Sequence, residues 1–171
     1  FERKLSEREL TTIAHGAEVQ AGTGLGDVVA QARGGAPIRL EPGGPQVNEL
    51  DGIPDRSRVE YHVIGELATD DVLADAGDQL TQAGTRALSM VVKEPTLDTF
   101  MRASRQFSRE ADLIEPAVRD VILDVSEAGG TAAMAMLGET VFALGTGLSD
   151  AGYDPGVCRI HPGGATLEEP V

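Results

Sequence analysis

The chain has 171 residues, of which 41% are hydrophobic, enough to bury one sizeable core or two small cores that share an interface. Its 28 acidic residues outnumber 14 basic ones, and the net charge of −14 makes nucleic acid and anionic membranes poor partners. No apolar run reaches the roughly 20 residues needed to cross a bilayer, and the first residues have no apolar signal core. We therefore expect a cytoplasmic globular protein.

Cysteine and lysine are both rare. The single cysteine, Cys158, excludes an internal disulfide and a cysteine-only metal site, and we expect it to be a small buried residue in a strand. Lys4 and Lys93 are the only lysines, so nearly all the positive charge is arginine. This composition resembles that of proteins from salt-loving archaea, and an acidic bacterial protein is the alternative.

The chain begins with a predicted helix. Ser6 and Glu9 fit a capping box, and apolar residues then recur at three-to-four spacing until Gly22 ends the pattern. Residues 22–27 read GTGLGD, half of them glycine. The following VVAQAR predicts a short helix that a Gly-Gly pair closes.

Strands and helices follow in the middle of the chain. Residues 36–41 predict a strand, and residues 58–64 alternate apolar and polar side chains, which favours a half-buried strand of an antiparallel sheet. Residues 69–128 have helical periodicity, which fits three or four helices. Breaks between these helices are expected at Gly84, at residues 93–95 and near Pro116.

The last part of the chain is rich in small residues. TAAMAML, at residues 131–137, favours a core strand and a turn over direct contact with phosphate. Residues 139–152 predict a further helix, and residues 156–161 and 165–168 predict two closing strands joined by a His-Pro-Gly-Gly turn. Strands separated by helices in this order indicate a two-layer α+β fold.

Two segments carry a resemblance to a known family. Residues 13–35 read IAHGAEVQAGTGLGDVVAQARGG, and residues 133–145 read AMAMLGETVFALG. The first resembles the segment of GHMP kinases in which a helix bearing a glutamate leads into a glycine-containing loop and an acidic residue opens a short helix. The second is similar to the family's third motif. The short loop is typical of an archaeal subgroup whose acceptor carries a carboxylate.

The resemblance implies the fold and the domains. Residues 1–50 would be the end of a ribosomal S5 domain 2-like N-terminal domain, with the catalytic helix and glycine loop. Residues 51–171 would be a ferredoxin-like, two-layer C-terminal domain. In this family a glycine/serine-rich motif upstream of the matched segment holds the nucleotide phosphates, and it is absent from these 171 residues. We therefore expect the intact protein to be a kinase, and these residues alone not to phosphorylate efficiently.

Asp27 is the candidate catalytic carboxylate. A kinase for a small alcohol must place the hydroxyl in line with the γ-phosphoryl group, and a nearby carboxylate can accept its proton. The glycines before Asp27, among them Gly24 and Gly26, would let the backbone approach the substrate closely. Local sequence alone leaves a helix N-cap equally open, and the resemblance favours the catalytic role. GTGLGD could instead cradle a phosphate, although it lacks the Lys-Ser or Lys-Thr of a P-loop.

Glu18 and His15 are three residues apart on one helix, so they share a face near the glycine loop. The resemblance makes Glu18 the Mg²⁺ ligand and a second catalytic residue, since Mg²⁺ needs few protein oxygens beside nucleotide phosphates. A solvent-facing glutamate is the alternative. His15 would hydrogen-bond a hydroxyl or a carboxylate of the acceptor.

Arg39 is the candidate partner of an acceptor carboxylate, because a guanidinium offers a fork of donors. It lies between Ile38 and Leu40 on a predicted strand, so alternation would turn it away from both. A surface arginine is the alternative. His62 and His161 lack such neighbours and are expected to be structural or exposed.

The resemblance thus implies an ATP- and Mg²⁺-dependent kinase acting on a small molecule, and it leaves a homodimer open as its assembly. A mevalonate or homoserine type of GHMP kinase is an alternative acceptor class. The rival from another class is a noncatalytic metabolite-binding domain that keeps the same fold.

Overall fold

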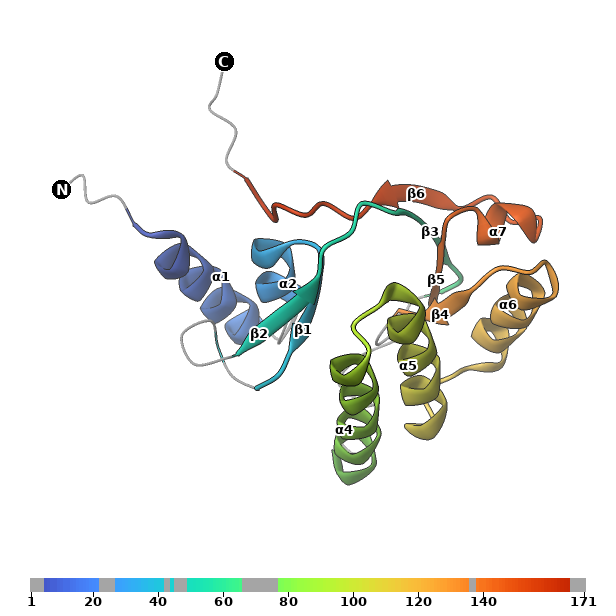
Figure 1. Ribbon diagram of the computed structural model, residues 1–171, viewed down its shortest axis with the longest axis horizontal. Coiled ribbons are helices and arrows are strands. Elements are labelled where there is room, and N and C mark those ends of the chain that lie inside the picture. Colours follow the sequence, from blue (N-terminus) through green and yellow to red (C-terminus); the bar gives the residue numbers. More distant parts are fainter. Residues whose placement is uncertain are drawn as a thin grey trace, which may run out of the picture. The chain divides into compact units, whose positions relative to one another are not determined.

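The computed structural model describes residues 5–21, 27–41, 44, 49–65, 77–135 and 138–166. The chain forms two compact units. One consists of Phe1–Arg56 together with Ile160–Val171, and the other is Ser57–Arg159. Figure 1 shows their elements in chain order. The assignment of these units to the two domains of a kinase stays a prediction.

The first unit opens with helix α1, Glu7–Ala21, where the capping box predicted one. The backbone N–H of Ser6 donates to Glu9 Oε2 at 2.9 Å, and the N–H of Glu9 donates to Ser6 Oγ at 3.3 Å. Both bonds satisfy amides that have no partner inside the helix, which fixes its start.

Helix α2, Asp27–Arg33, and strand β1, Ala36–Arg39, also lie where the sequence predicted them. Strand β1 pairs antiparallel with β2, Leu50–Ile53, which the sequence analysis did not predict. The buried side chains Val29, Ile38 and Ile53 come from these three elements and form the interior of the unit.

The second unit holds a four-stranded antiparallel sheet with strand order β4-β5-β3-β6. The strands are β3 (Arg58–Val63), β4 (Ala132–Met134), β5 (Thr140–Leu144) and β6 (Gly156–Arg159). The helices are α4 (Gly77–Lys93), α5 (Leu97–Glu110), α6 (Pro116–Glu127) and α7 (Gly147–Asp150). The first strand of this unit lies between its third and fourth, as in a ferredoxin-like arrangement. The α+β prediction is confirmed.

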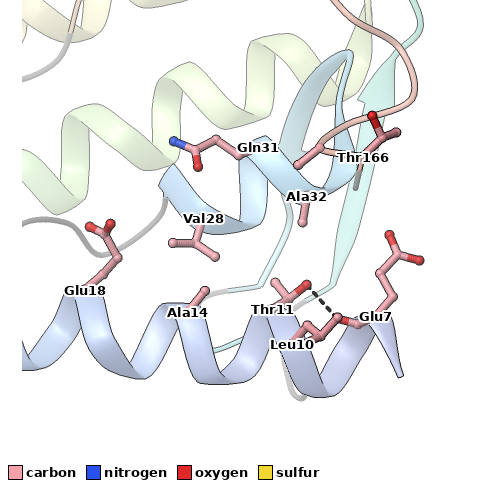
Figure 2. A pocket seen from close by; sticks show the side chains of 10 residues that line it. Glu7, Leu10, Thr11, Ala14, Glu18, Val28, Gln31, Ala32 and Thr166 are labelled. Atoms are coloured by element: carbon pink, nitrogen blue, oxygen red, sulfur yellow. Dashed lines mark hydrogen bonds between the residues drawn. The ribbon is translucent and has the colours of Figure 1, made fainter. Parts of the chain in front are cut away.

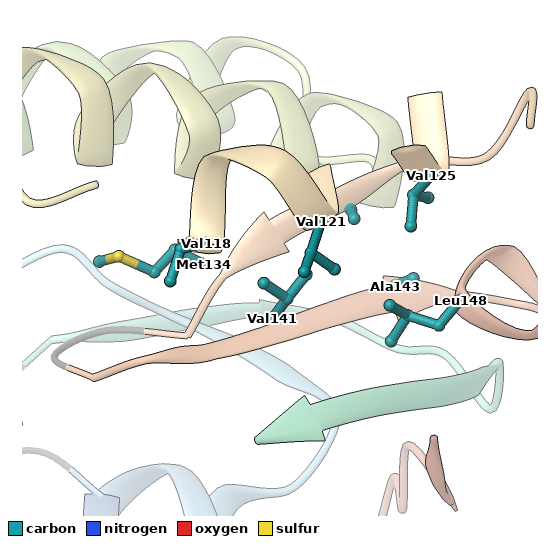
Figure 3. Packing of buried hydrophobic residues seen from close by; sticks show 8 residues of the cluster. Val118, Val121, Val125, Met134, Val141, Ala143 and Leu148 are labelled. Carbon is teal, nitrogen blue, oxygen red and sulfur yellow. The ribbon is translucent and has the colours of Figure 1, made fainter. Parts of the chain in front are cut away.

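The core of this unit lies between α6 and the sheet (Figure 3). Val118, Val121 and Val125 recur at helical spacing on α6 and point toward the strands. Val141 and Ala143 meet them from alternate positions of β5. Each of these five side chains is buried, so the helix and the central strands are held by apolar packing.

The helix predicted over residues 139–152 is wrong for its first half, which forms strand β5. Val141 and Ala143 are buried whereas Phe142 is only partly buried, a period of two that a strand requires. Strand β5 pairs with β4 on one side and β3 on the other. Only the short helix α7 forms in the second half.

Three smaller expectations were also wrong. Helix α4 continues through Gly84, which lies beside the Phe107 ring where α4 packs on α5. Cys158 is exposed, as are its neighbours Val157 and Arg159 on β6, an edge strand of the described sheet. Ala165 and Thr166 are not in a strand, and residues 167–168 of that prediction lie outside the described residues.

In the described part of the chain, no helix has the length and apolar character that a membrane span requires.

Candidate functional site

Four of the predicted site residues lie in the first unit. Helix α1 carries His15 and Glu18, Asp27 is the first residue of α2, and Arg39 is the last residue of β1. Gly24 and Gly26 lie outside the described residues. The two helices and the strand that hold the proposed chemistry are therefore consecutive elements of one unit.

A cavity of about 610 Å³ lies between α1, α2 and the C-terminal segment of the chain (Figure 2). Its walls include Leu10 and Ala14 of α1, Val28 and Ala32 of α2, and Thr166. The centre of the cavity is therefore apolar, with the small side chain of Ala14 opposite Val28.

Glu18 lines one end of this cavity and Glu7 lines the other (Figure 2). Glu18 is partly buried and belongs to the row of α1 residues that faces α2. Among the described residues, no group of three or more His, Cys, Asp or Glu side chains gathers as a metal cage. One protein carboxylate at a cavity can suffice for Mg²⁺, which takes its other ligands from water and nucleotide phosphates.

Asp27 is exposed at the start of α2, and the next residue, Val28, lines the cavity. A carboxylate at this end of a helix is favoured by the positive end of the helix dipole. At this position Asp27 can stabilise the start of the helix and can also present a reactive carboxylate to a substrate. The two roles of Asp27 are therefore compatible, and its neighbour Val28, not Asp27 itself, is among the residues that line the cavity.

His15 and Arg39 lie elsewhere in the unit. The His15 ring faces Gly44, where an added Cβ would lie 3.4 Å from His15 Cδ2. Arg39 is half-buried, with its Nε atom buried, and its register partner on β2 is Leu50. Neither residue is among those that line the cavity in the described part of the chain. Of the four predicted residues, Glu18 alone contributes a wall.

The C-terminal segment is the part of the site that the sequence analysis missed. Thr166 lines the cavity, and the N–H of Ala165 donates to the Gln31 carbonyl of α2 at 2.7 Å. The sequence signal for this contact was two glycine pairs, one after α2 and one in the His-Pro-Gly-Gly turn. Pairs of glycines mark places where two backbones can approach closely.

Glu60 is a second feature that the sequence did not indicate. Its side chain on β3 is fully buried and accepts hydrogen bonds from the N–H groups of Leu148 and Ser149, at 3.1 and 3.0 Å. Ser149 Oγ and Arg58 Nη2 each donate to Glu60 Oε1 at 2.7 Å. Burial raises the pKa of Glu60, but the hydrogen bonds from Ser149 and Arg58 outweigh it and lower the pKa to about 2. Glu60 thus stays ionised and anchors α7 to the sheet.

Of the two other histidines, His62 packs on another ring and His161 is exposed. The His62 ring packs on Tyr153 with ring centroids 5.1 Å apart. The Tyr153 hydroxyl donates to Asp124 Oδ2 at 2.5 Å, and this hydrogen bond, with burial, raises the pKa of Tyr153 to about 12. His161 is exposed, and its Nδ1 lies 3.0 Å from the carbonyl oxygen of Gly164.

Comparisons with known proteins identify the class. No protein-family model matches the chain. A solved structure described as a phosphotransferase related to the CoA biosynthesis pathway superposes with a TM-score of 0.75 at 27% identity, over 89% of this chain and 54% of that one. A homoserine kinase from Cytophaga hutchinsonii shares the fold with a TM-score of 0.61 at 15% identity, over 94% of this chain and 59% of its own. The fold is that of GHMP-type kinases, as the sequence motifs predicted.

The sequence relatives are more specific. The chain is 33% identical to the pantoate kinase of Methanocaldococcus jannaschii over 134 residues, 77% of this chain and 49% of the relative. It is 36% identical to the pantoate kinase of Methanospirillum hungatei over 143 residues, 82% of this chain and 47% of the relative. The chain is therefore a homologue of pantoate kinases within the GHMP kinases. It spans about half the length of the pantoate kinases it matches.

Proposed function

We propose that the intact protein containing this chain uses ATP and Mg²⁺ to phosphorylate pantoate to 4-phosphopantoate, a step of coenzyme A synthesis. The observation that carries the proposal is homology to pantoate kinases over 77% to 82% of the chain. The short GTGLGD loop, which resembles the pantoate kinase form of the motif, supports the same acceptor. The position of Glu18 on a cavity whose α2 wall begins beside Asp27 supports the kinase chemistry.

In the proposed reaction the pantoate hydroxyl oxygen forms a bond to the γ-phosphorus of ATP. The bond from that phosphorus to the β,γ-bridging oxygen breaks, and ADP leaves. The hydroxyl proton passes to the carboxylate of Asp27, which would act as general base or stabilise the developing charge. The exposure of Asp27 at the helix start leaves its carboxylate open to the acceptor.

The other residues would hold the reactants. Glu18 would supply the protein oxygen for Mg²⁺, which neutralises charge on the phosphates when it is bound. Arg39 would pair with the pantoate carboxylate through its guanidinium, and His15 would hydrogen-bond the acceptor. Gly24 and Gly26, which lie outside the described residues, would bind the acceptor. Because His15 and Arg39 lie outside the described cavity wall, their contacts require an acceptor site that extends beyond that wall.

An acceptor assay tests the proposal directly. The full-length protein, supplied with ATP and Mg²⁺, is compared on pantoate, homoserine and mevalonate by the release of ADP. We expect kcat/KM for pantoate to exceed the other two by at least about a hundredfold. All three acceptors carry a carboxylate, so a site built for pantoate must discriminate by the shape of the carbon chain and the placing of its hydroxyl groups. A preference for homoserine or mevalonate would assign the protein to a sister kinase.

Substituting Asp27 tests its role. Asp27→Ala is expected to lower kcat roughly a hundredfold or more and to leave the thermal midpoint almost unchanged, because the residue is exposed. Asp98→Ala is the matched control, since Asp98 is also an exposed acidic residue in a helix first turn. Pantoate binding without turnover in the wild-type full-length protein would instead favour a metabolite-binding domain.

A further inference from the structure

Residues 161–165, here called the C-terminal clasp, close over the end of α2. The N–H of Gly35 donates to the His161 carbonyl at 2.9 Å, and the N–H of Ala165 donates to the Gln31 carbonyl at 2.7 Å. Two backbone segments that are far apart in the sequence are therefore joined at both ends of one turn. The carbonyl of Gln31 is one of the last four of the helix, which have no partner within it.

The approach is so close that only glycine fits on each side. A Cβ on Gly34 would lie 2.1 Å from the Gly164 nitrogen, and a Cβ on Gly164 would lie 2.1 Å from the Ala32 carbonyl oxygen. Both glycines also have positive φ, +69° and +67°, which other residues rarely adopt. Because the atoms in the way are backbone, neither clash is relieved by turning a side chain.

Helix α2 depends on contacts with other segments of the chain for its stability. It has seven residues and a single buried one, Val29, and so short a helix is not stable by itself. The clasp holds its last turn, and the candidate base Asp27 is its first residue. Because α2 is only seven residues, about two turns, Asp27 lies close enough to the last turn for a shift there to reach it.

We propose that the C-terminal clasp is a positioning element for the catalytic helix, with Gly34 and Gly164 as positioning residues that act through α2 on Asp27. This inference rests on the proposed kinase function. Residues 161–165 would thus contribute to catalysis without touching the substrate. The clasp would set kcat, because a misplaced reactive group slows the chemical step even where binding is intact.

The test uses the full-length kinase and the variants Gly164→Ala and Gly34→Ala. Each is expected to lower kcat for pantoate at least tenfold with KM changed less than threefold, at a temperature where circular dichroism shows the variant to be folded. Hydrogen exchange at the Gly35 amide is expected to become at least tenfold faster, because this amide donates across the clasp.

Gly129→Ala is the matched control. Gly129 also has a positive φ, +82°, but nothing lies within 4 Å of an added Cβ, so the substitution brings backbone strain without a clash. It is expected to leave kcat and the Gly35 exchange rate within twofold of wild type. If Gly164→Ala and Gly34→Ala do not fold, His161→Ala replaces them, since it keeps both backbone hydrogen bonds of the clasp and removes the ring whose Nδ1 lies 3.0 Å from the Gly164 carbonyl oxygen. We then expect at least threefold effects in the same two measurements.

The outcomes separate the two proposals. Faster exchange with an unchanged kcat, while Asp27→Ala is inactive, would overturn the positioning role and leave the kinase assignment intact. If Asp27→Ala retained full activity, the proposed role of Asp27 would fail. The positioning role of the clasp would then fail as well, even if hydrogen exchange at the Gly35 amide were faster in the clasp variants. Wild-type exchange and wild-type kcat in the clasp variants would show that the clasp does not control α2.

Discussion

At the scale of single residues, Glu60 is a fully buried carboxylate in the second unit. A buried carboxylate is costly unless hydrogen bonds replace its water. The N–H groups of Leu148 and Ser149 and the Ser149 hydroxyl, all on α7, donate hydrogen bonds to the Glu60 carboxylate in place of water. Arg58, which lies on β3 like Glu60, donates a further hydrogen bond from its guanidinium. The carboxylate thus ties the start of α7 to the middle of β3.

Glu60→Gln is expected to lower the free energy of unfolding at pH 7 by about 3 kcal/mol, the value of a pKa lowered from 4.5 to about 2. The folded state binds fewer protons than the unfolded state between these values. The contribution is therefore complete above pH 4.5 and is lost as the pH falls toward 2. Urea unfolding of both proteins from pH 7 to pH 2.5 measures it, and the difference between them should shrink with acid.

A surface carboxylate provides the comparison. Glu110 pairs with Arg86 at 2.8 Å near the surface, where solvent weakens an ion pair. Glu110→Gln should therefore have a much smaller effect than Glu60→Gln. Equal losses of stability for the two variants, at every pH, would contradict the role given to Glu60.

At the scale of elements, α6 and α1 differ in what they cover. Helix α6 buries Val118, Val121 and Val125 against the sheet. No residue of α1, all of which lies in the described part, is buried, and Leu10 and Ile13 are 43% and 61% exposed. The stability of α6 thus comes from tertiary packing, whereas α1 relies on its capping box and on one partly covered face.

Val125→Ala should lower the free energy of unfolding by about 2 kcal/mol, because it removes two buried methyl groups and leaves a cavity beside the sheet. Leu123→Ala, on the same helix, is the control: Leu123 is 52% exposed, so its truncation should have a far smaller effect. Chemical unfolding followed by circular dichroism compares the two. A similar loss from both would mean that α6 does not pack through the face identified.

At the scale of the whole molecule, the two units differ in how many segments of the chain form them: the first has two and the second has one. Ser57–Arg159 is one uninterrupted segment that contains the whole α6–sheet core, whereas the first unit needs both ends of the chain. The net charge of −14 is that of all 171 residues together. A halophilic origin and a homodimer both stay predictions.

Because its core is self-contained, the segment Ser57–Arg159 produced alone is expected to fold with a cooperative thermal transition. The Val125→Ala substitution should lower the midpoint in the segment as it does in the whole chain. Circular dichroism melts of the four proteins provide the measurement. A broad transition without a midpoint in the segment would show that its fold needs the rest of the molecule.

Local patterns in the sequence predicted many of the elements well. The Ser6–Glu9 capping box formed as expected, because it depends on neighbours within one turn. The helix of VVAQAR also formed where it was predicted, although its end accepts a hydrogen bond from Ala165. The two quoted motifs led to the correct family. The sites inferred from that family stay predictions, apart from the observation that Glu18 lines a cavity.

What the sequence could not predict depends on contacts between distant segments. Alternation on β3 suggested a half-buried strand, yet the buried side chain is Glu60, while Tyr61 and Val63 are 43% and 58% exposed. Its amide donors on α7 lie 88 and 89 residues away, and no local pattern reports them. Residues 140–144 likewise form a strand and not a helix because they pair with a strand on each side.

The sequence by itself therefore determined the start of α1, the extent of α2, the class of fold and the family of kinases. The tertiary structure alone decided which face of β3 is buried, that β5 is a strand, and that the C-terminal turn closes on α2. The physical reason is range: caps and periodicity act within a few residues, whereas burial and backbone-to-backbone contacts arise only when remote segments meet.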